Sequence, residues 1–65
     1  MDKIEQTLRE IDREIAFTDE QIEDLCRDRE SMPLRIFTEE YQELSEYKKD
    51  LYEVRGIVEA FRMLE

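Results

Sequence analysis

The sequence predicts an all-α protein in which two long antiparallel helices form a coiled-coil-like hairpin. Three observations support this fold class. The chain is rich in good helix formers and has a single glycine, Gly56, so few turns are expected. The only strong helix breaker, Pro33, lies close to the midpoint of the 65 residues. Apolar residues recur every seven positions on both sides of it, which is the pattern of a helix packed along a partner helix.

The first helix is expected over about residues 3–30. Its apolar positions form two rows with a seven-residue repeat, and between them the residues are nearly all charged. One row contains Leu8, Ile15 and Ile22, and the other contains Ile4, Ile11 and Leu25, with Thr18 in its one polar position. Such a narrow stripe suits a helix that packs against one neighbour.

A local signal inside this arm leaves an alternative open. The string Phe17-Thr18-Asp19-Glu20-Gln21 can be interpreted as a helix start, with Thr18 and Gln21 as a capping box. A break near Phe17 and Thr18 would give a three-helix bundle. A continuous helix is favoured because the seven-residue repeat runs through Thr18 without a shift of phase, and no glycine or proline accompanies the signal.

The turn is expected at about residues 31–37 and the second helix at about 38–64. Proline disfavours a helical conformation in the residue before it, so the break falls at Met32 and Pro33. Thr38 is a candidate N-cap, followed by Glu39 and Glu40 in the first turn. A short helical turn that begins at Pro33 is also possible, because proline is favoured at a first helical position.

The second arm has a wider apolar face. One row contains Phe37, Leu44, Leu51 and Val58, the other contains Tyr47, Val54 and Phe61, and Ile36, Ile57 and Leu64 flank them. A wide stripe indicates more than one neighbouring helix. A chain of this size also has a small core and, with one cysteine, no internal disulfide. We therefore expect a homodimeric four-helix bundle, in which these rows form the core and the dimer seam. Alternatively, the flanking residues cover the loop and helix ends of one hairpin.

Composition narrows the possible partners and the compartment. There are 19 acidic and 10 basic residues, for a net charge of -9. Such a surface repels phosphate backbones and anionic lipids, so we expect no direct binding of nucleic acid or membranes, and attraction to a basic surface on another protein. A single cysteine, the lack of an apolar leader and the lack of a membrane-spanning run indicate one cytoplasmic domain, residues 1–65.

Catalytic chemistry finds little support in the sequence. There is no histidine, no glycine-rich phosphate loop, and no base near Ser31 or Ser45. Cys26 is expected at the edge of the seam as a half-buried thiol. The sequence therefore predicts a protein that is not an enzyme and that has no cofactor or metal site.

The candidate partner-binding residues are aromatic or acidic. Phe17, Tyr41 and Tyr52 fall outside or at the edge of the seam, where an aromatic side chain can anchor a partner. The acidic candidates are Asp19, Glu20, Glu23, Glu39, Glu43, Glu46 and Asp50. The leading hypothesis is a protein-binding regulator, adaptor or inhibitor of the small bacterial or phage accessory type. The alternatives are an acidic mimic of nucleic acid, and a structural coiled-coil assembly element.

Overall fold

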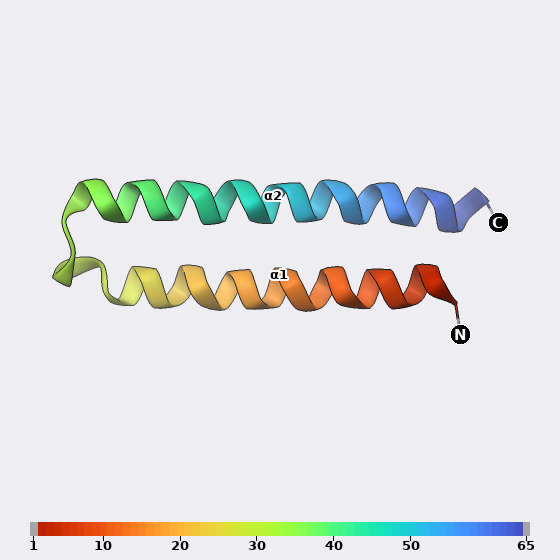
Figure 1. Ribbon diagram of the computed structural model, residues 1–65, viewed down its shortest axis with the longest axis horizontal. Coiled ribbons are helices and arrows are strands. Elements are labelled where there is room, and N and C mark those ends of the chain that lie inside the picture. Colours follow the sequence, from red (N-terminus) through yellow and green to blue (C-terminus); the bar gives the residue numbers. More distant parts are fainter. Residues whose placement is uncertain (1, 65) are drawn as a thin grey trace.

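The computed structural model describes residues 2–64, which form two antiparallel helices side by side (Figure 1). Helix α1 spans Lys3–Arg27, a short 3-10 helix (η1) spans Arg29–Ser31, and α2 spans Leu34–Leu64. The Cα atoms extend over 49 × 17 × 10 Å. The predicted all-α hairpin is confirmed, and the part of the chain that the structure describes contains no strand.

Helix α1 is continuous, so the alternative of a three-helix bundle is wrong. Its N-cap is Asp2, whose side chain accepts a hydrogen bond of 2.9 Å from the Ile4 backbone N–H. Thr18 does not start a new helix, because its hydroxyl donates to the Glu14 carbonyl at 2.8 Å within the same helix. The hydroxyl thus has an acceptor in the preceding turn, and Thr18 can be buried without loss of a hydrogen bond.

The turn is shorter than the sequence indicated. Helix α1 ends at Arg27 and not near residue 30, and a backbone bond of 3.0 Å from Ser31 to Asp28 closes the 3-10 turn. Met32 is extended, as expected before a proline. Helix α2 begins at Leu34, four residues before the expected start, and the Pro33 carbonyl accepts from the Phe37 N–H at 3.0 Å. The short helical turn after Pro33 is therefore continuous with α2.

The expected N-cap of the second helix needs a correction. Thr38 lies inside α2, where its hydroxyl donates to the Leu34 carbonyl at 2.8 Å. The hydroxyl therefore satisfies a carbonyl of the preceding turn, and cannot cap the following one. Pro33 lies five residues before Thr38 and directly before the first helical residue, where its ring fixes φ at a value compatible with the start of a helix.

Among residues 2–64, the fully buried residues all belong to α1. This core consists of Leu8, Ile11, Ile15 and Leu25 together with Thr18, which has no exposed surface. Ile4 and Ile22 of the same rows are half-buried. On α2 the row of Phe37, Leu44, Leu51 and Val58 contacts this core and is half-buried, and no residue of α2 is fully buried.

The second predicted row of α2 does not face α1 within the single hairpin. Tyr47, Val54 and Phe61 are exposed on the hairpin, and the half-buried positions beside Leu44 and Leu51 are Lys48 and Arg55. An antiparallel pair leaves each helix one contact stripe, so only one of the two neighbouring rows can face α1. The structure selects the row that pairs with acidic residues of α1.

Candidate partner-binding site

Three ion pairs join the two helices along one side of the hairpin, which we call the ladder side. Lys48 pairs with Asp19, Arg55 with Asp12 at 2.7 Å, and Arg62 with Glu5 at 3.3 Å. The basic positions rise by seven residues while the acidic positions fall by seven, as antiparallel helices require. The ladder therefore fixes the register of α2 against α1.

The ladder contacts change the proton affinity of their cations. A hydrogen bond to Asp19 raises the pKa of Lys48, and a hydrogen bond to Asp12 raises the pKa of Arg55. In each case the neighbouring carboxylate stabilises the charged form of the base. The stems of Lys48 and Arg55 also cover the seam, because about one third of each side chain remains exposed.

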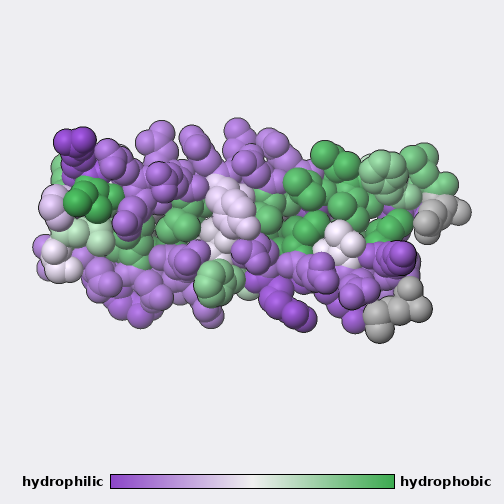
Figure 2. Space-filling model, in the orientation of Figure 1, coloured by the Kyte–Doolittle hydropathy of each residue, from purple (hydrophilic) through white to green (hydrophobic). Residues whose placement is uncertain are grey.

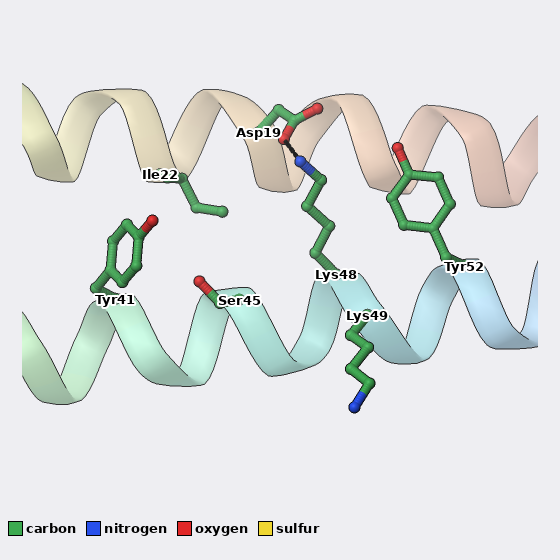
Figure 3. A pocket seen from close by; sticks show the side chains of 7 residues that line it. All are labelled: Asp19, Ile22, Tyr41, Ser45, Lys48, Lys49 and Tyr52. Atoms are coloured by element: carbon green, nitrogen blue, oxygen red, sulfur yellow. Dashed lines mark ion pairs between the residues drawn. The ribbon is translucent and has the colours of Figure 1, made fainter.

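An open groove of about 390 Å³ lies on the ladder side near the middle of the hairpin (Figure 3). Tyr41 and Tyr52 lie at its two ends, and Lys48 reaches across to Asp19 between them. The remaining lining residues are Ile22, Ser45 and Lys49, and the Lys49 amine points away from α1. The Tyr41 ring stacks on Phe37 with centroids 5.8 Å apart, which holds that end of the groove in place.

The opposite side of the hairpin carries different chemistry. Glu14 and Phe17 lie roughly 140° and 200° around α1 from Asp19, at about 100° per residue. The Tyr47 hydroxyl donates to Glu14 at 3.1 Å, so Tyr47 shares this second side. That bond raises the pKa of Tyr47, because the carboxylate accepts from the neutral phenol. We call this second side of the hairpin the apolar side, and define it by Tyr47, Val54 and Phe61.

A stripe of carboxylates runs along α2 away from α1. Glu39, Glu43, Glu46, Asp50 and Glu53 are exposed and follow one another at intervals of four and three residues, which places them on one helical face. Glu39 pairs with Arg35 at 3.4 Å. Within residues 2–64, no ion pair joins the other four to a basic side chain.

The structure thus divides the candidate residues among three surfaces. Tyr41, Tyr52 and Asp19 meet at the groove, and Phe17 lies on the apolar side. Glu39, Glu43, Glu46 and Asp50 share the outer stripe of α2, whereas Glu20 and Glu23 are exposed on α1. The candidates therefore do not form one continuous surface.

Four residues of the groove were not among the predicted partner-binding residues, namely Ser45, Lys48, Lys49 and Ile22, which was predicted only for the seam. The sequence does contain a pattern that pairs Lys48 with Asp19. The basic row 48, 55, 62 and the acidic row 19, 12, 5 have the same spacing in opposite directions. Matching those rows would have placed Lys48 on Asp19 and identified the ladder side.

Three further features of residues 2–64 lie outside the groove. Cys26 is exposed, and not half-buried as expected, because the seam ends at Leu25. No three His, Cys, Asp or Glu side chains of this part of the chain converge as metal ligands would. Neither described helix has a stretch that is both long and apolar enough to cross a lipid bilayer.

Comparison with protein-family models, with curated proteins and with solved structures gives no match for this chain. The fold and its surfaces define a small acidic helical hairpin with an aromatic-ended groove.

Proposed function

We propose that this protein is a non-catalytic regulator, adaptor or inhibitor that binds another protein in the groove between Tyr41 and Tyr52. The observation that carries the proposal is the groove itself, where two exposed tyrosines face the same open space about 16 Å apart along α2. Tyrosine is enriched at binding hot spots because a rigid ring offers apolar area and a polar tip at low entropic cost.

The side chains of the groove favour binding over catalysis. Its titratable groups are two phenols, two amines and the carboxylate of Asp19, which Lys48 already neutralises. Ser45 is the one aliphatic hydroxyl of the groove, and among residues 2–64 no side-chain hydrogen bond connects it to a group that could activate it as a nucleophile. Ile22 projects from α1 toward α2 and offers apolar surface on which a side chain of the partner can pack.

The charge of the chain indicates the kind of partner. With a net charge of -9, the hairpin attracts proteins that carry a basic surface and increases their rate of encounter. Within the groove, however, the Lys48–Asp19 pair is locally neutral. We infer that long-range charge directs a basic partner to the hairpin, and that the tyrosines supply the short-range contacts.

The test is a comparison of single variants against a captured partner. A tagged hairpin is used to retain proteins from its native lysate, and the retained protein is then purified and titrated by calorimetry. Tyr41→Ala and Tyr52→Ala should each weaken binding by about 2 kcal/mol or more, as hot-spot residues do.

Phe17→Ala, on the apolar side, is the matched control and should bind as wild type does. Helicity, followed by circular dichroism, should be unchanged in all three variants, since these side chains are exposed. Equal affinity of wild type and both tyrosine variants would refute the groove as the binding site.

A second candidate function has a specific observation in its favour. The outer stripe of α2 presents carboxylates about every 4.5 to 6 Å along a rigid helix, a regular row of negative charge like that of a phosphate backbone but more widely spaced. Such a stripe could occupy the basic channel of a nucleic-acid-binding protein. In that case Glu43→Gln combined with Glu46→Gln should release the partner, competing DNA or RNA should displace the hairpin, and salt should weaken binding steeply. Binding that persists in high salt and without these two carboxylates would exclude the mimic.

A further inference from the structure

The apolar side of α2 carries a row of large side chains that α1 does not cover. Tyr47, Val54 and Phe61 follow one another at intervals of seven residues and are 44%, 47% and 59% exposed. Ile57 and Leu64 flank the same row and are also exposed. Figure 2 shows an apolar patch over the C-terminal part of α2, next to hydrophilic surface. A contiguous patch of this kind on a small chain indicates an interface.

We propose that this row is the contact surface of a homodimer, in which α2 of one copy packs antiparallel on α2 of the second copy with the two-fold axis at Val54. This inference goes beyond the proposed function, because the surface lies on the side of the hairpin opposite the Tyr41–Tyr52 groove. A dimer of this kind leaves both grooves open.

The spacing of the row argues for a second copy as the occupant. Tyr47 and Phe61 are each seven residues from Val54, so the row is symmetric about its middle. Antiparallel pairing around Val54 places Val54 on Val54 and each Tyr47 on Phe61 of the other copy. A two-fold interface requires that kind of self-complementary surface, and the two aromatic pairs add to the apolar contact.

The hydrogen bond of Tyr47 is compatible with burial of its ring. Its hydroxyl already donates to Glu14 at 3.1 Å at the edge of α1. The ring can therefore be covered by Phe61 of the second copy without leaving a buried donor unsatisfied. At this end of the row, Tyr47 can therefore offer its ring as an apolar contact while its hydroxyl keeps a hydrogen-bond partner.

The acidic residues beside the row favour the antiparallel arrangement. Glu40 occupies the position that precedes Tyr47 in the same row, and Glu43 and Asp50 lie on the neighbouring row. In a parallel dimer, each of these carboxylates would lie beside the same carboxylate of the second copy, and the two like charges would repel. In the antiparallel dimer the two Asp50 residues are about 12 Å apart along the axis and the two Glu43 residues about 33 Å, beyond the screening length at physiological salt.

The available area is sufficient for a specific dimer. The five exposed apolar side chains of the row and its flanks offer on the order of 500 Å² per copy, and two copies with a polar rim reach the lower end of the range of stable interfaces. The gain is largest for α2, which has no fully buried residue in the single hairpin. The second copy completes the burial of that helix.

Sedimentation equilibrium of the full chain tests the contact. Wild type should be a dimer that dissociates on dilution, and Val54→Asp should weaken the dimer at least tenfold, because it places two charges on the axis. Ala60→Asp adds the same charge to α2 outside the row and is the matched control, which should dimerise as wild type does. A monomeric wild type, or a Val54→Asp variant as strongly dimeric as the control, would overturn the proposal.

A spin-label measurement tests the direction of the helices without altering the row, in case Val54→Asp fails to fold. A nitroxide is attached at Glu43→Cys in a Cys26→Ser background. The antiparallel dimer predicts a distance of about 35 Å between labels across the dimer, given a rise of 1.5 Å per residue. A distance under about 20 Å would indicate a parallel pair and overturn the assignment. Neither result depends on the groove, so failure here is separable from failure of partner binding.

Discussion

The two helices differ in how completely the hairpin buries their apolar residues. Of the residues that the structure describes, all the fully buried ones belong to α1, including Leu8, Ile11 and Ile15, and the one large exposed apolar side chain of α1 is Phe17. Helix α2 is longer and carries more apolar residues, yet none of them is fully buried. The hairpin therefore buries the apolar stripe of α1 but leaves much of the apolar surface of α2 exposed.

The difference follows from the shape of the contact stripes. The narrow stripe of α1 lies between a row of large apolar side chains on α2, such as Leu44 and Leu51, and a row of long basic ones, such as Lys48 and Arg55. The alkyl stems of the basic residues cover the edge of α1 while their charged ends reach solvent and the ladder carboxylates. Covering α1 in this way turns the remaining apolar row of α2 outward.

The largest expected effect comes from making the same truncation on each helix. Ile11 is 9% exposed and Ile57 is 59% exposed. Ile11→Ala should lower the free energy of unfolding by about 2–4 kcal/mol, because it removes buried methyl groups and leaves a cavity between the helices. Urea denaturation followed by circular dichroism measures the loss. For a chain with so small a core, this is enough to abolish folding at room temperature.

Ile57→Ala is the matched control for that comparison. At low protein concentration, where a dimer dissociates, it should change the free energy of unfolding by less than about 0.5 kcal/mol. Equal losses from the two variants would show that Ile11 and Ile57 are buried to the same extent, and would contradict the difference between the two helices.

A smaller effect is expected from replacing a buried threonine with leucine. The seven-residue pattern would place leucine at position 18, but Thr18 has no exposed surface and lies where the two helices meet. Thr18→Leu should therefore destabilise the hairpin by about 1–3 kcal/mol, through overpacking. Thr38→Leu is the control, because the Thr38 hydroxyl makes the same bond of 2.8 Å to the carbonyl four residues earlier but is exposed. Thermal unfolding of both variants checks this, and a stabilised Thr18→Leu variant would contradict it.

The sequence predicted the architecture because its signals were local and strong. Pro33 marks the turn, and the rows of Leu8 and Ile11 on one arm and Leu44 and Leu51 on the other have a clear period. It could not decide which second row of α2 faces α1, because the rows that begin at Tyr47 and at Lys48 both repeat every seven residues. Hydropathy favours the first row, and only pairing between the arms selects the second.

The groove was not predictable for a related reason. Its two ends, Tyr41 and Tyr52, were candidates by exposure, but their common location depends on the register that the ladder sets. The separation of Phe17 from both tyrosines also follows from that register. Local patterns thus predicted which aromatic and acidic residues are exposed, and the pairing of the helices determined which of them share a surface.

The ladder register can be tested by exchanging a charge pair. Asp12→Arg alone places a cation beside Arg55 and should lower the urea midpoint, by less than Ile11→Ala does. The double variant Asp12→Arg, Arg55→Asp restores opposite charges and should recover most of that midpoint. Added salt should reduce the difference between single and double variants, because exposed pairs are screened. If the double variant is no more stable than the single one, these side chains do not face each other.

The smallest expected effect is the alkaline response of the apolar side. The Tyr47 pKa is raised above its ordinary value of 10.0 because the neutral phenol donates to Glu14. The folded state therefore holds this proton more tightly than the unfolded state, and the contribution is fully present below pH 10.0 and is lost as the pH rises through the folded pKa. Tyr47→Phe should thus lose less stability than wild type between neutral and strongly alkaline pH. Urea midpoints measured across that range provide the comparison.

The raised pKa of Lys48 acts in the same direction on the ladder side, so wild type and Tyr47→Phe both retain that part of the alkaline loss of stability. Tyr52→Phe removes a phenol that makes no hydrogen bond among residues 2–64 and is the matched control, which should follow the wild-type curve. Curves for wild type and Tyr47→Phe that stay parallel above pH 10.0 would mean that the Tyr47–Glu14 bond does not link α2 to α1 in solution.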